Sequence, residues 1–581
     1  MAFESSFFES GKRSRLSAIL AWLFHPADGP GNRFVPRWIF LRALALIYFS
    51  AFFSLLFQIE GLIGPRGILP AGHYLAAVFA EMGRLGFWYA PSLFWLSASS
   101  HAMMAVVWIG LVASVAAFVN AWPRLSLFVC FLCFMSFVTA AQDFSSYQSD
   151  SMLLEAGFIA LFFAPRGLWP SWGASAPTSR ISLFLLQWEW FRIYFESGVV
   201  KLLSGDPEWR HFTAMDEYYQ NGPLPTWIGW YVQHFPHWFH AATVGATLAM
   251  ELAIVWMLFL PRRVRFLCFC IVTPWEIGVI LTANYTFLNY LVLSLGFLLL
   301  DDRTIRSLVP RRLHAWLPQP AGPSAPEASS PAPDPAGAPS GLSDAGQSAA
   351  PALPEGEPNR ARPAAFTGLP RRSVGIFHMV GVTVASFLLL WNAYATTGEL
   401  VRMFWQDAPV WTAPIAALEP LRIANQYGLF AVMTRGRYEI EFQGSNNGED
   451  WTPYQFRFKP QALNQPPGIY APYQPRFEWN LWFASLGSWR QSNFVPLTEE
   501  RLLENDPAVL SLFRGNPFPQ SPPRYVKAVL WQYWFTSMSE KRSTGDWWRR
   551  ELVGLYAPEL TRQGDGEFSV IEWPEELGPH D

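Results

Sequence analysis

The chain has 581 residues, of which 51% are hydrophobic and 17% aromatic, while only 15% are charged. Soluble domains carry about 25% charged residues, so this deficit predicts a membrane protein. The net charge of −3 excludes a strong electrostatic attraction to nucleic acid. All four cysteines lie in apolar runs. This setting favours the interpretation that the cysteines are small apolar residues of membrane helices. The alternative is that Cys130 and Cys133 form a thiol-exchange pair.

The first part of the chain is organised as a series of long apolar runs. Residues 1–37 are polar and mixed, which predicts a cytoplasmic N-terminal segment without a cleavable signal peptide. Apolar runs that approach the roughly 20 residues needed to cross a bilayer then recur between residues 38 and 303. They predict a transmembrane helical bundle with helices at 38–58, 102–121, 125–141, 151–164, 181–203, 241–260, 264–282 and 285–300.

Basic residues between these runs indicate the orientation of the bundle. Lys and Arg favour the cytoplasmic side of a membrane. If the helices alternate from a cytoplasmic N-terminus, every basic junction falls inside, including Arg124, Arg166, Arg180, Arg262 and Arg303. The charge pattern therefore supports both the number of crossings and their direction.

A sharp change of composition follows the bundle. Residues 317–372 are rich in Pro, Ala, Gly and Ser, which predicts a disordered cytoplasmic linker. A last transmembrane helix is expected at 374–393, with Arg371 and Arg372 on its inner side. It brings the count to eight or nine and carries residues 396–581 to the extracytoplasmic face.

This C-terminal domain has the pattern of a β-rich fold. Tyr438, Ile440 and Phe442 alternate with polar neighbours at the period of a strand, and Asn446-Asn447-Gly448 supplies turn residues. We expect a β-sandwich-like core with added helices around 499–513 and 523–537. Trp451 and Tyr454 are expected in its core.

Several long phrases, in order along the chain, resemble the lipase maturation factor family. They include "SYQSDSMLLEAGFIALFFAP", "SGVVKLLSGDPEWR", "GRYEIEFQGSNNGEDWTPYQFRFKP" and "APYQPRFEWNLWFASL". Glu478 departs from the family pattern, in which Asp is usual, and Ala283 stands where Gly is usual.

The resemblance implies a multi-pass membrane protein that assists folding and assembly of secreted lipases, a chaperone rather than an enzyme. Animal members of the family lie in the endoplasmic reticulum membrane with a lumenal C-terminal domain. The Pro- and Ala-rich linker favours a bacterial inner membrane with a periplasmic C-terminal domain. The implied partners are a lipase-like client and membrane lipids, without a cofactor.

A second, local resemblance is to vitamin K-dependent γ-carboxylases and their membrane relatives. It rests on "ESGVVKLLSGDPEW" and "GLIGPRGILP". This resemblance implies the alternative function, a membrane enzyme that acts on a lipophilic cofactor with Lys201 as its catalytic base. The competing interpretation is that Lys201 extends to the outer interface, as lysines near helix ends do.

Charged residues recur within the apolar runs. Glu189, Arg192 and Glu196 share one helical face, and Lys201, five residues later, is not expected to pair with Glu196. Ionisable groups at membrane depth usually face the bundle interior. We therefore predict a buried polar cluster made of Glu155, Glu189, Arg192, Glu196, Glu251 and Glu276.

The C-terminal domain also contains a candidate client-binding surface. Trp479, Trp482 and Phe483 are expected to be exposed aromatics that hold an unfinished client. His234, His237 and His240 stand three apart, but Pro236 interrupts the helix that would align them, so no metal site is expected. Asn284 begins a formal glycosylation sequon and is interpreted as a turn signal. No common hydrolase, nucleotide-binding or metalloprotease motif occurs in the sequence.

Overall fold

The computed structural model describes residues 33–145, 147–173, 178–318, 371–564 and 566–575. Most of the predicted N-terminal segment and nearly all of the predicted linker lie outside these residues. The chain forms two units, one of residues 1–318 with 386–581 and the other of residues 319–385. Everything that bears on the candidate site lies in the first unit.

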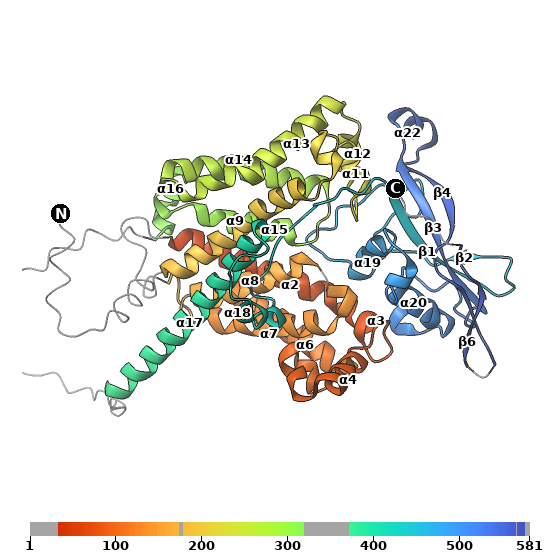
Figure 1. Cartoon of the computed structure of the whole chain (residues 1–581), viewed down its shortest axis with the longest axis horizontal. Helices are drawn as coiled ribbons and strands as arrows, with labels where there is room; N and C mark the ends of the chain where they lie inside the picture. Colours follow the sequence, from red (N-terminus) through yellow and green to blue (C-terminus); the bar gives the residue numbers. More distant parts are fainter. Residues whose placement is uncertain (1–32, 146, 174–177, 319–370, 565, 576–581) are drawn as a thin grey trace, which may run out of the picture. The chain divides into compact units, whose positions relative to one another are not determined.

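Helices make up the first part of this unit (Figure 1). The longer ones coincide with the predicted apolar runs. The α-helices of this part are α2 Phe34–Leu56, α3 Ile59–Ile63, α4 Ala71–Met82, α5 Gly86–Tyr89, α6 Ser100–Phe118, α7 Pro123–Ala140, α8 Gln148–Phe163, α9 Arg180–Leu203, α10 Pro207–Arg210, α11 Tyr218–Asn221, α12 Trp227–Gln233, α13 His237–Leu252, α14 Arg262–Thr282, α15 Leu288–Gly296 and α16 Asp302–Leu308.

Six helices among the described residues are long and apolar enough to cross a membrane. They are Phe34–Leu56, Ser100–Phe118, Pro123–Ala140, His237–Phe259, Arg262–Thr282 and Met379–Phe404, the last within α17 Arg371–Phe404. The other three predicted spans are also helical, but α8 has only 16 residues, α9 contains five charged side chains, and the apolar stretch Leu288–Leu299 is short. When the charged side chains of a helix face protein rather than lipid, composition alone makes the helix appear too polar to cross a membrane.

Serine side chains cap two of the longer helices. Ser99 caps α6 by accepting a hydrogen bond from the amide of Ala102, and Ser179 caps α9 by accepting one from Ser182. α7 begins with Pro123, whose missing N–H costs nothing in the first turn. The helix boundaries thus follow from local sequence even where tertiary contacts decide which face is buried.

The C-terminal domain is built on one antiparallel sheet (Figure 1). Its elements are α18 Ala413–Ala416, β1 Arg437–Ser445, β2 Thr452–Pro453, α19 Arg476–Ala484, α20 Phe494–Leu503, α21 Pro507–Leu510, β3 Tyr525–Phe535, α22 Met538–Thr544, β4 Trp548–Leu555, β5 Glu559–Arg562 and β6 Phe568–Glu572. The strand order is β2-β1-β3-β5-β6, with β4 also paired to β3. The described strands form a single sheet rather than the two packed sheets of a sandwich, and α19 and α20 cover it instead.

The central strand β3 falls where a helix was expected, so the prediction of a helix over 523–537 was wrong. Its sequence YVKAVLWQYWF is rich in aromatic and β-branched residues, which favour strands. Val526, Ala528 and Leu530 are buried at the period of two that a strand requires. The other expected helix, 499–513, is present as parts of α20 and α21.

The hairpin of β1 and β2 confirms the turn prediction, with Gly448 at φ +79° and Gln443 paired with Pro453. Tyr454 is fully buried as expected, whereas Trp451 is half-buried beneath Lys527. Both faces of β1 are buried, including the face with Glu439 and Glu441. The alternating sequence of β1 suggests that its charged face is exposed to solvent, but other parts of the chain cover this face.

Two buried arginine side chains join the C-terminal domain to the helical bundle. Arg476 at the start of α19 donates two hydrogen bonds, of 2.7 and 2.8 Å, to Asp150 at the start of α8. Arg437 of β1 donates to the carbonyls of Gln220 and Pro223 at 3.0 and 3.1 Å. Both guanidinium groups are fully buried, so these contacts fix the two parts relative to each other.

Candidate functional site

The charged face of α9 forms the polar interior of the helical bundle. Arg192 makes a close ion pair with Glu155 of α8 and lies 4.0 Å from Glu196 one turn further along. All three side chains are buried, and Glu189, also buried, lies near Glu155 and Arg192. The predicted cluster therefore exists around Arg192, where one cation faces several carboxylates.

A segment of the C-terminal part fills the centre of this cluster. We call residues 423–434, which precede β1, the strap. Asn425 accepts a hydrogen bond of 2.5 Å from Arg192 through its carbonyl. The Tyr427 amide donates to Glu196 at 2.6 Å, and its hydroxyl donates to Glu155 at 2.8 Å. The strap thus adds hydrogen-bond donors to the buried carboxylates of Glu155 and Glu196, which also face Arg192.

The strap continues along α9 and the segment after it, bound mainly through its backbone. Polar side chains of the bundle contact nearly every second residue of it. These contacts are Gln148 with the amide of Gly428 (3.1 Å), Ser197 with the amide of Leu429 (3.3 Å), Trp209 with the carbonyl of Phe430 (3.0 Å), Asp206 with the amide of Met433 (2.6 Å) and Asn221 with the carbonyl of Thr434 (2.8 Å). The sequence analysis did not identify the strap, because its side chains show no strong pattern.

Lys201 belongs to the same arrangement. Its ammonium donates to Glu251 at 2.8 Å, to the carbonyl of Leu429 at 2.9 Å and to that of Ser197 at 3.3 Å. It also lies 5.1 Å from the ring of Trp209. Only 2% of the residue is exposed, so the expectation that it extends to the outer interface was wrong. Lys201 does not pair with Glu196, as its position on the helix predicted.

The last member of the predicted cluster stands apart from the ion pairs. Glu276 of α14 accepts a hydrogen bond of 2.6 Å from the hydroxyl of Tyr194. The six predicted acidic and basic residues therefore divide into three contacts, around Arg192, Lys201 and Tyr194. All three involve α9, which explains why this helix carries so many polar residues.

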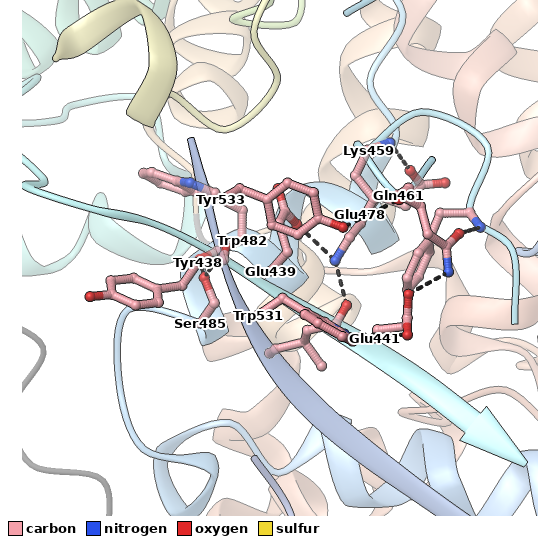
Figure 2. Close-up of polar contacts among 12 residues, drawn as sticks. Tyr438, Glu439, Glu441, Lys459, Gln461, Glu478, Trp482, Ser485, Trp531 and Tyr533 are labelled. Carbon is pink, nitrogen blue, oxygen red and sulfur yellow. Dashed lines mark hydrogen bonds and ion pairs between the residues drawn. The ribbon is translucent and has the colours of Figure 1, made fainter. Parts of the chain in front are cut away.

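A second polar cluster lies inside the C-terminal domain, beneath the buried charged face of β1 (Figure 2). Lys459 donates to Glu439 at 2.8 Å and to the carbonyl of Ile440 at 2.5 Å. Glu441 accepts hydrogen bonds from Gln461 at 3.0 Å and from the indole of Trp531 at 3.3 Å. These pairs satisfy the charges of β1 in place of water.

Glu478 of α19 anchors the loop that covers this cluster. Its carboxylate accepts from the consecutive amides of Arg457, Phe458 and Lys459 at 2.9, 2.8 and 2.6 Å. Burial nevertheless raises the pKa of Glu478 to about 7, because desolvation outweighs these amide donors. The loop and α19 are thus held together by one side chain.

The predicted client-binding aromatics all lie on α19, but only one of them is exposed. Phe483 is 47% exposed, whereas Trp479 and Trp482 are 7% and 6% exposed, so the expectation of an open surface was wrong for both tryptophans. Tyr147 and Tyr285 of the helical bundle pack against Trp479, with ring centroids 6.2 and 6.3 Å apart. Residues from the bundle thus cover what α19 alone would expose.

All three aromatics line one cavity of about 490 Å3. It lies where α19, the strap, the start of α8 and the segment before α15 meet. Besides those three, its walls include Tyr147, Gln148, Tyr285, Leu288, Phe430, Val432 and Leu486. A cavity of this size, largely apolar with a few polar groups, is typical of ligand and peptide sites.

The remaining candidates have structural contacts. His234 contacts the carbonyls of Trp230 and Thr536, His237 contacts Asp216, and His240 is buried. Within the described ranges, no three His, Cys, Asp or Glu residues gather in a way that would hold a metal. Asn284 is buried and bonds to Leu224, Pro225, Gly468, Tyr470 and Ala471, so its side chain joins two distant segments of the chain.

Comparison with known proteins covers both parts of the chain. Residues 35–307 match the family model described as the lipase maturation factor transmembrane domain. Residues 423–558 match the lipase maturation factor C-terminal domain, and this match begins at the first residue of the strap.

Full-length relatives show the same extent of similarity. Lipase maturation factor 2 of Gallus gallus is 32% identical over 90% of this chain and 81% of its own length. Lipase maturation factor 1 of Bos taurus is 29% identical over 94% of this chain and 92% of its own length. Lipase maturation factor 2 of Homo sapiens is 30% identical, with 91% and 83% covered. No solved structure matches the chain. The chain belongs to the lipase maturation factor family.

Proposed function

We propose that this protein is a membrane-embedded maturation factor that assists the folding and assembly of secreted lipases or other exported clients. The observation that carries the proposal is the similarity over both parts of the chain to relatives named for lipase maturation. A fold alone does not define function. Similarity that includes both the bundle and the C-terminal domain reduces the range of possible functions.

The C-terminal domain, residues 396–581, is proposed to lie on the extracytoplasmic side, in a bacterial periplasm or, in a eukaryote, in the lumen of the endoplasmic reticulum. Nine crossings from a cytoplasmic N-terminus require this placement, and helices occupy all nine predicted spans. The basic junctions at Arg124 and Arg262 then remain inside. A client that has crossed the membrane meets the C-terminal domain on the same side.

Trp479, Trp482 and Phe483 are proposed as client contacts, through the cavity that they line rather than through an open patch. Phe483 stands at the exposed rim, while the two tryptophans form the wall. Aromatic side chains offer a large apolar area with little loss of conformational freedom on binding.

The alternative function, an enzyme that uses Lys201 as a base, gains no support from the site geometry. A catalytic base must be free to take a proton from its substrate. The ammonium of Lys201 instead donates to one carboxylate and two carbonyls, and its surroundings are filled by the strap and Trp209. Its proposed role is to hold the strap on α9.

Maturation activity is tested by expressing a secreted lipase from the same organism with and without this protein. We expect the enzyme activity per molecule of secreted lipase to fall at least several-fold when the protein is deleted, and to return when the gene is supplied. Lipase that is equally active without the protein would refute the proposal. Retention of maturation in the double variant Lys201→Met/Glu251→Gln would separate the chaperone from the enzyme.

A further inference from the structure

A second cavity lies next to the one lined by α19. It has a volume of about 400 Å3 and shares Tyr147 and Gln148 with the first. The strap forms a wall of both, with Asn425, Gln426 and Tyr427 in the second cavity and residues 428–432 in the first. The two cavities therefore follow consecutive residues of one segment, as a groove for an extended chain does.

The two cavities differ in chemistry. Six aromatic side chains line the first cavity, which we call the aromatic cavity: Tyr147, Tyr285, Phe430, Trp479, Trp482 and Phe483. The second, which we call the acidic cavity, is lined by Glu399, Glu419 and Arg402. Arg402 lies 3.5 Å from Glu399, which leaves the carboxylate of Glu419 in excess. A ligand that fits both places an apolar group in one and a positive charge in the other.

The indole of Trp482 adds a directional requirement. Its N–H is buried and has no hydrogen-bond acceptor among the residues that the structure describes. A buried donor without an acceptor is unfavourable, and a ligand carbonyl in the aromatic cavity would relieve this cost. Backbone carbonyls recur along a polypeptide, whereas an acyl chain carries none along its length.

We propose that the aromatic and acidic cavities together bind an extended segment of the client polypeptide. A large apolar or aromatic side chain of the segment enters the aromatic cavity, a basic side chain of the same segment reaches the acidic cavity, and a backbone carbonyl accepts from Trp482. The proposal rests on the proposed maturation function and names the feature of the client that is recognised. Folded proteins bury such apolar side chains, so the groove selects segments that have not yet folded.

Polar walls distinguish this occupant from a lipid. Gln148, Ser149, Thr286 and Thr434 line the aromatic cavity among the aromatic rings. An acyl chain offers these side chains no hydrogen-bonding group, whereas a peptide backbone supplies donors and acceptors at intervals of about 3.3 Å per residue. A lipid occupant is therefore the alternative that the experiment must exclude.

The test uses the full-length protein in detergent micelles and fluorescein-labelled peptides of twelve residues. Each peptide contains one Trp and one Lys, separated by two, four or six residues, in a Gly/Ser background. Fluorescence anisotropy is expected to show saturable binding for at least one spacing. Replacement of the peptide Trp by Ser should weaken binding by roughly tenfold or more, since it removes most of the buried apolar area. Replacement of the Lys by Glu should weaken binding by several-fold, and less so at high salt.

Protein variants locate the binding site. Trp482→Phe keeps an aromatic ring but removes the N–H, and should weaken peptide binding by roughly three- to tenfold, the usual worth of one hydrogen bond. Phe483→Ser should weaken peptide binding more than Trp482→Phe does. Trp573→Phe is the matched control, because Trp573 is an exposed tryptophan of the same domain outside both cavities.

The outcomes separate this proposal from the maturation function. Absence of saturable peptide binding, or equal affinity in wild type, Trp482→Phe and Trp573→Phe, would overturn the groove. Binding of a dansyl-labelled fatty acid that Phe483→Ser abolishes, without peptide binding, would assign the cavities to lipid and also overturn it. Normal lipase maturation in Phe483→Ser despite lost peptide binding would refute the groove as the client site while the maturation function stands.

Discussion

Charged side chains in the helical bundle form ion pairs, and the cation of each pair also donates a hydrogen bond to the strap. Lys201 bridges Glu251 and Leu429, and Arg192 bridges Glu155 and Asn425. A buried pair gives little net stability compared with apolar residues, but loss of one partner is costly. These residues therefore determine where the strap binds and contribute little to the net stability of the protein.

The first prediction concerns Lys201 and Glu251. Lys201→Met should destabilise the protein by about 3 kcal/mol, because it leaves the Glu251 carboxylate and two carbonyls without their donor. The double variant Lys201→Met/Glu251→Gln should recover most of this loss. Thermal unfolding in detergent measures both. A double variant no more stable than the single variant would show that the pair is not the source of the effect.

At the same scale, the buried carboxyl of Glu499 on α20 has no ion-pair partner among the residues that the structure describes. Burial, with the charges of Glu500 and Glu559, raises the pKa of Glu499 well above its ordinary value, despite the nearby amide of Ala528. The folded state therefore holds its proton more tightly than the unfolded state. The stability associated with Glu499 is greatest below the unfolded pKa, about 4.3, and falls as the pH rises toward the folded pKa.

The second prediction follows from this sign. Glu499→Gln cannot ionise and should be more stable than wild type by about 1–3 kcal/mol at pH 8, with a smaller difference at pH 5. Melting temperatures at the two pH values measure it. Glu449→Gln is the control, since Glu449 is exposed on the β1–β2 turn. An advantage of Glu499→Gln that is the same at both pH values would contradict the explanation.

At the scale of elements, the strap is the connection on which the candidate site depends. It has no regular secondary structure, and its backbone groups are satisfied by side chains of α8, α9 and the segment after α9. The strap also forms a wall of both cavities. The buried charges of the bundle therefore shape the proposed peptide groove indirectly, by holding this wall in place.

The third prediction tests that link. Tyr427→Phe removes the hydroxyl that donates to Glu155 and should lower stability by about 1–3 kcal/mol, because a buried carboxylate loses a donor. It should also increase proteolysis within residues 423–434. Tyr525→Phe serves as the control, since its hydroxyl makes no hydrogen bond to any residue in the described ranges. Equal stability of the two variants would mean that the hydroxyl does not anchor the strap.

For the whole molecule, the parity of membrane crossings decides which side the C-terminal domain faces. The six helices that qualify by length and composition would return the chain to the cytoplasm, whereas nine would not. Under the proposed topology, α8, α9 and α15 supply the three additional crossings. α9 contacts α8, α13 and α15, and most of its residues are buried, so protein rather than lipid surrounds its charges. The bundle needs all three helices to enclose its polar interior.

The fourth prediction is the resulting topology. Alkaline phosphatase, which folds only outside the cytoplasm, should be active when fused after residue 581 and inactive when fused within residues 319–370. Green fluorescent protein, which fluoresces when fused on the cytoplasmic side, should give the opposite pattern. The reverse result at residue 581 would place the C-terminal domain in the cytoplasm and remove it from contact with exported clients.

Much of this protein was determined by its sequence alone. Apolar runs of spanning length and the period-two pattern at 438–442 predicted the helices and the start of the sheet, because each signal is local. The spacing of Glu189, Arg192 and Glu196 predicted one buried polar face for the same reason. The resemblance to the family rests on long sequence phrases, which can be recognised without knowledge of the fold.

Only the tertiary structure decided the partners of those groups. Lys201 lies near a helix end, where it looks free to reach water, until the strap from more than 220 residues away covers it. Trp479 was expected to be exposed on α19, but Tyr147 and Tyr285 of the helical bundle cover it. The strand β3 was predicted as a helix, although its own residues favour a strand, and its partner β1 lies far away in the sequence. Burial depends on which distant segments meet, and no local pattern encodes that.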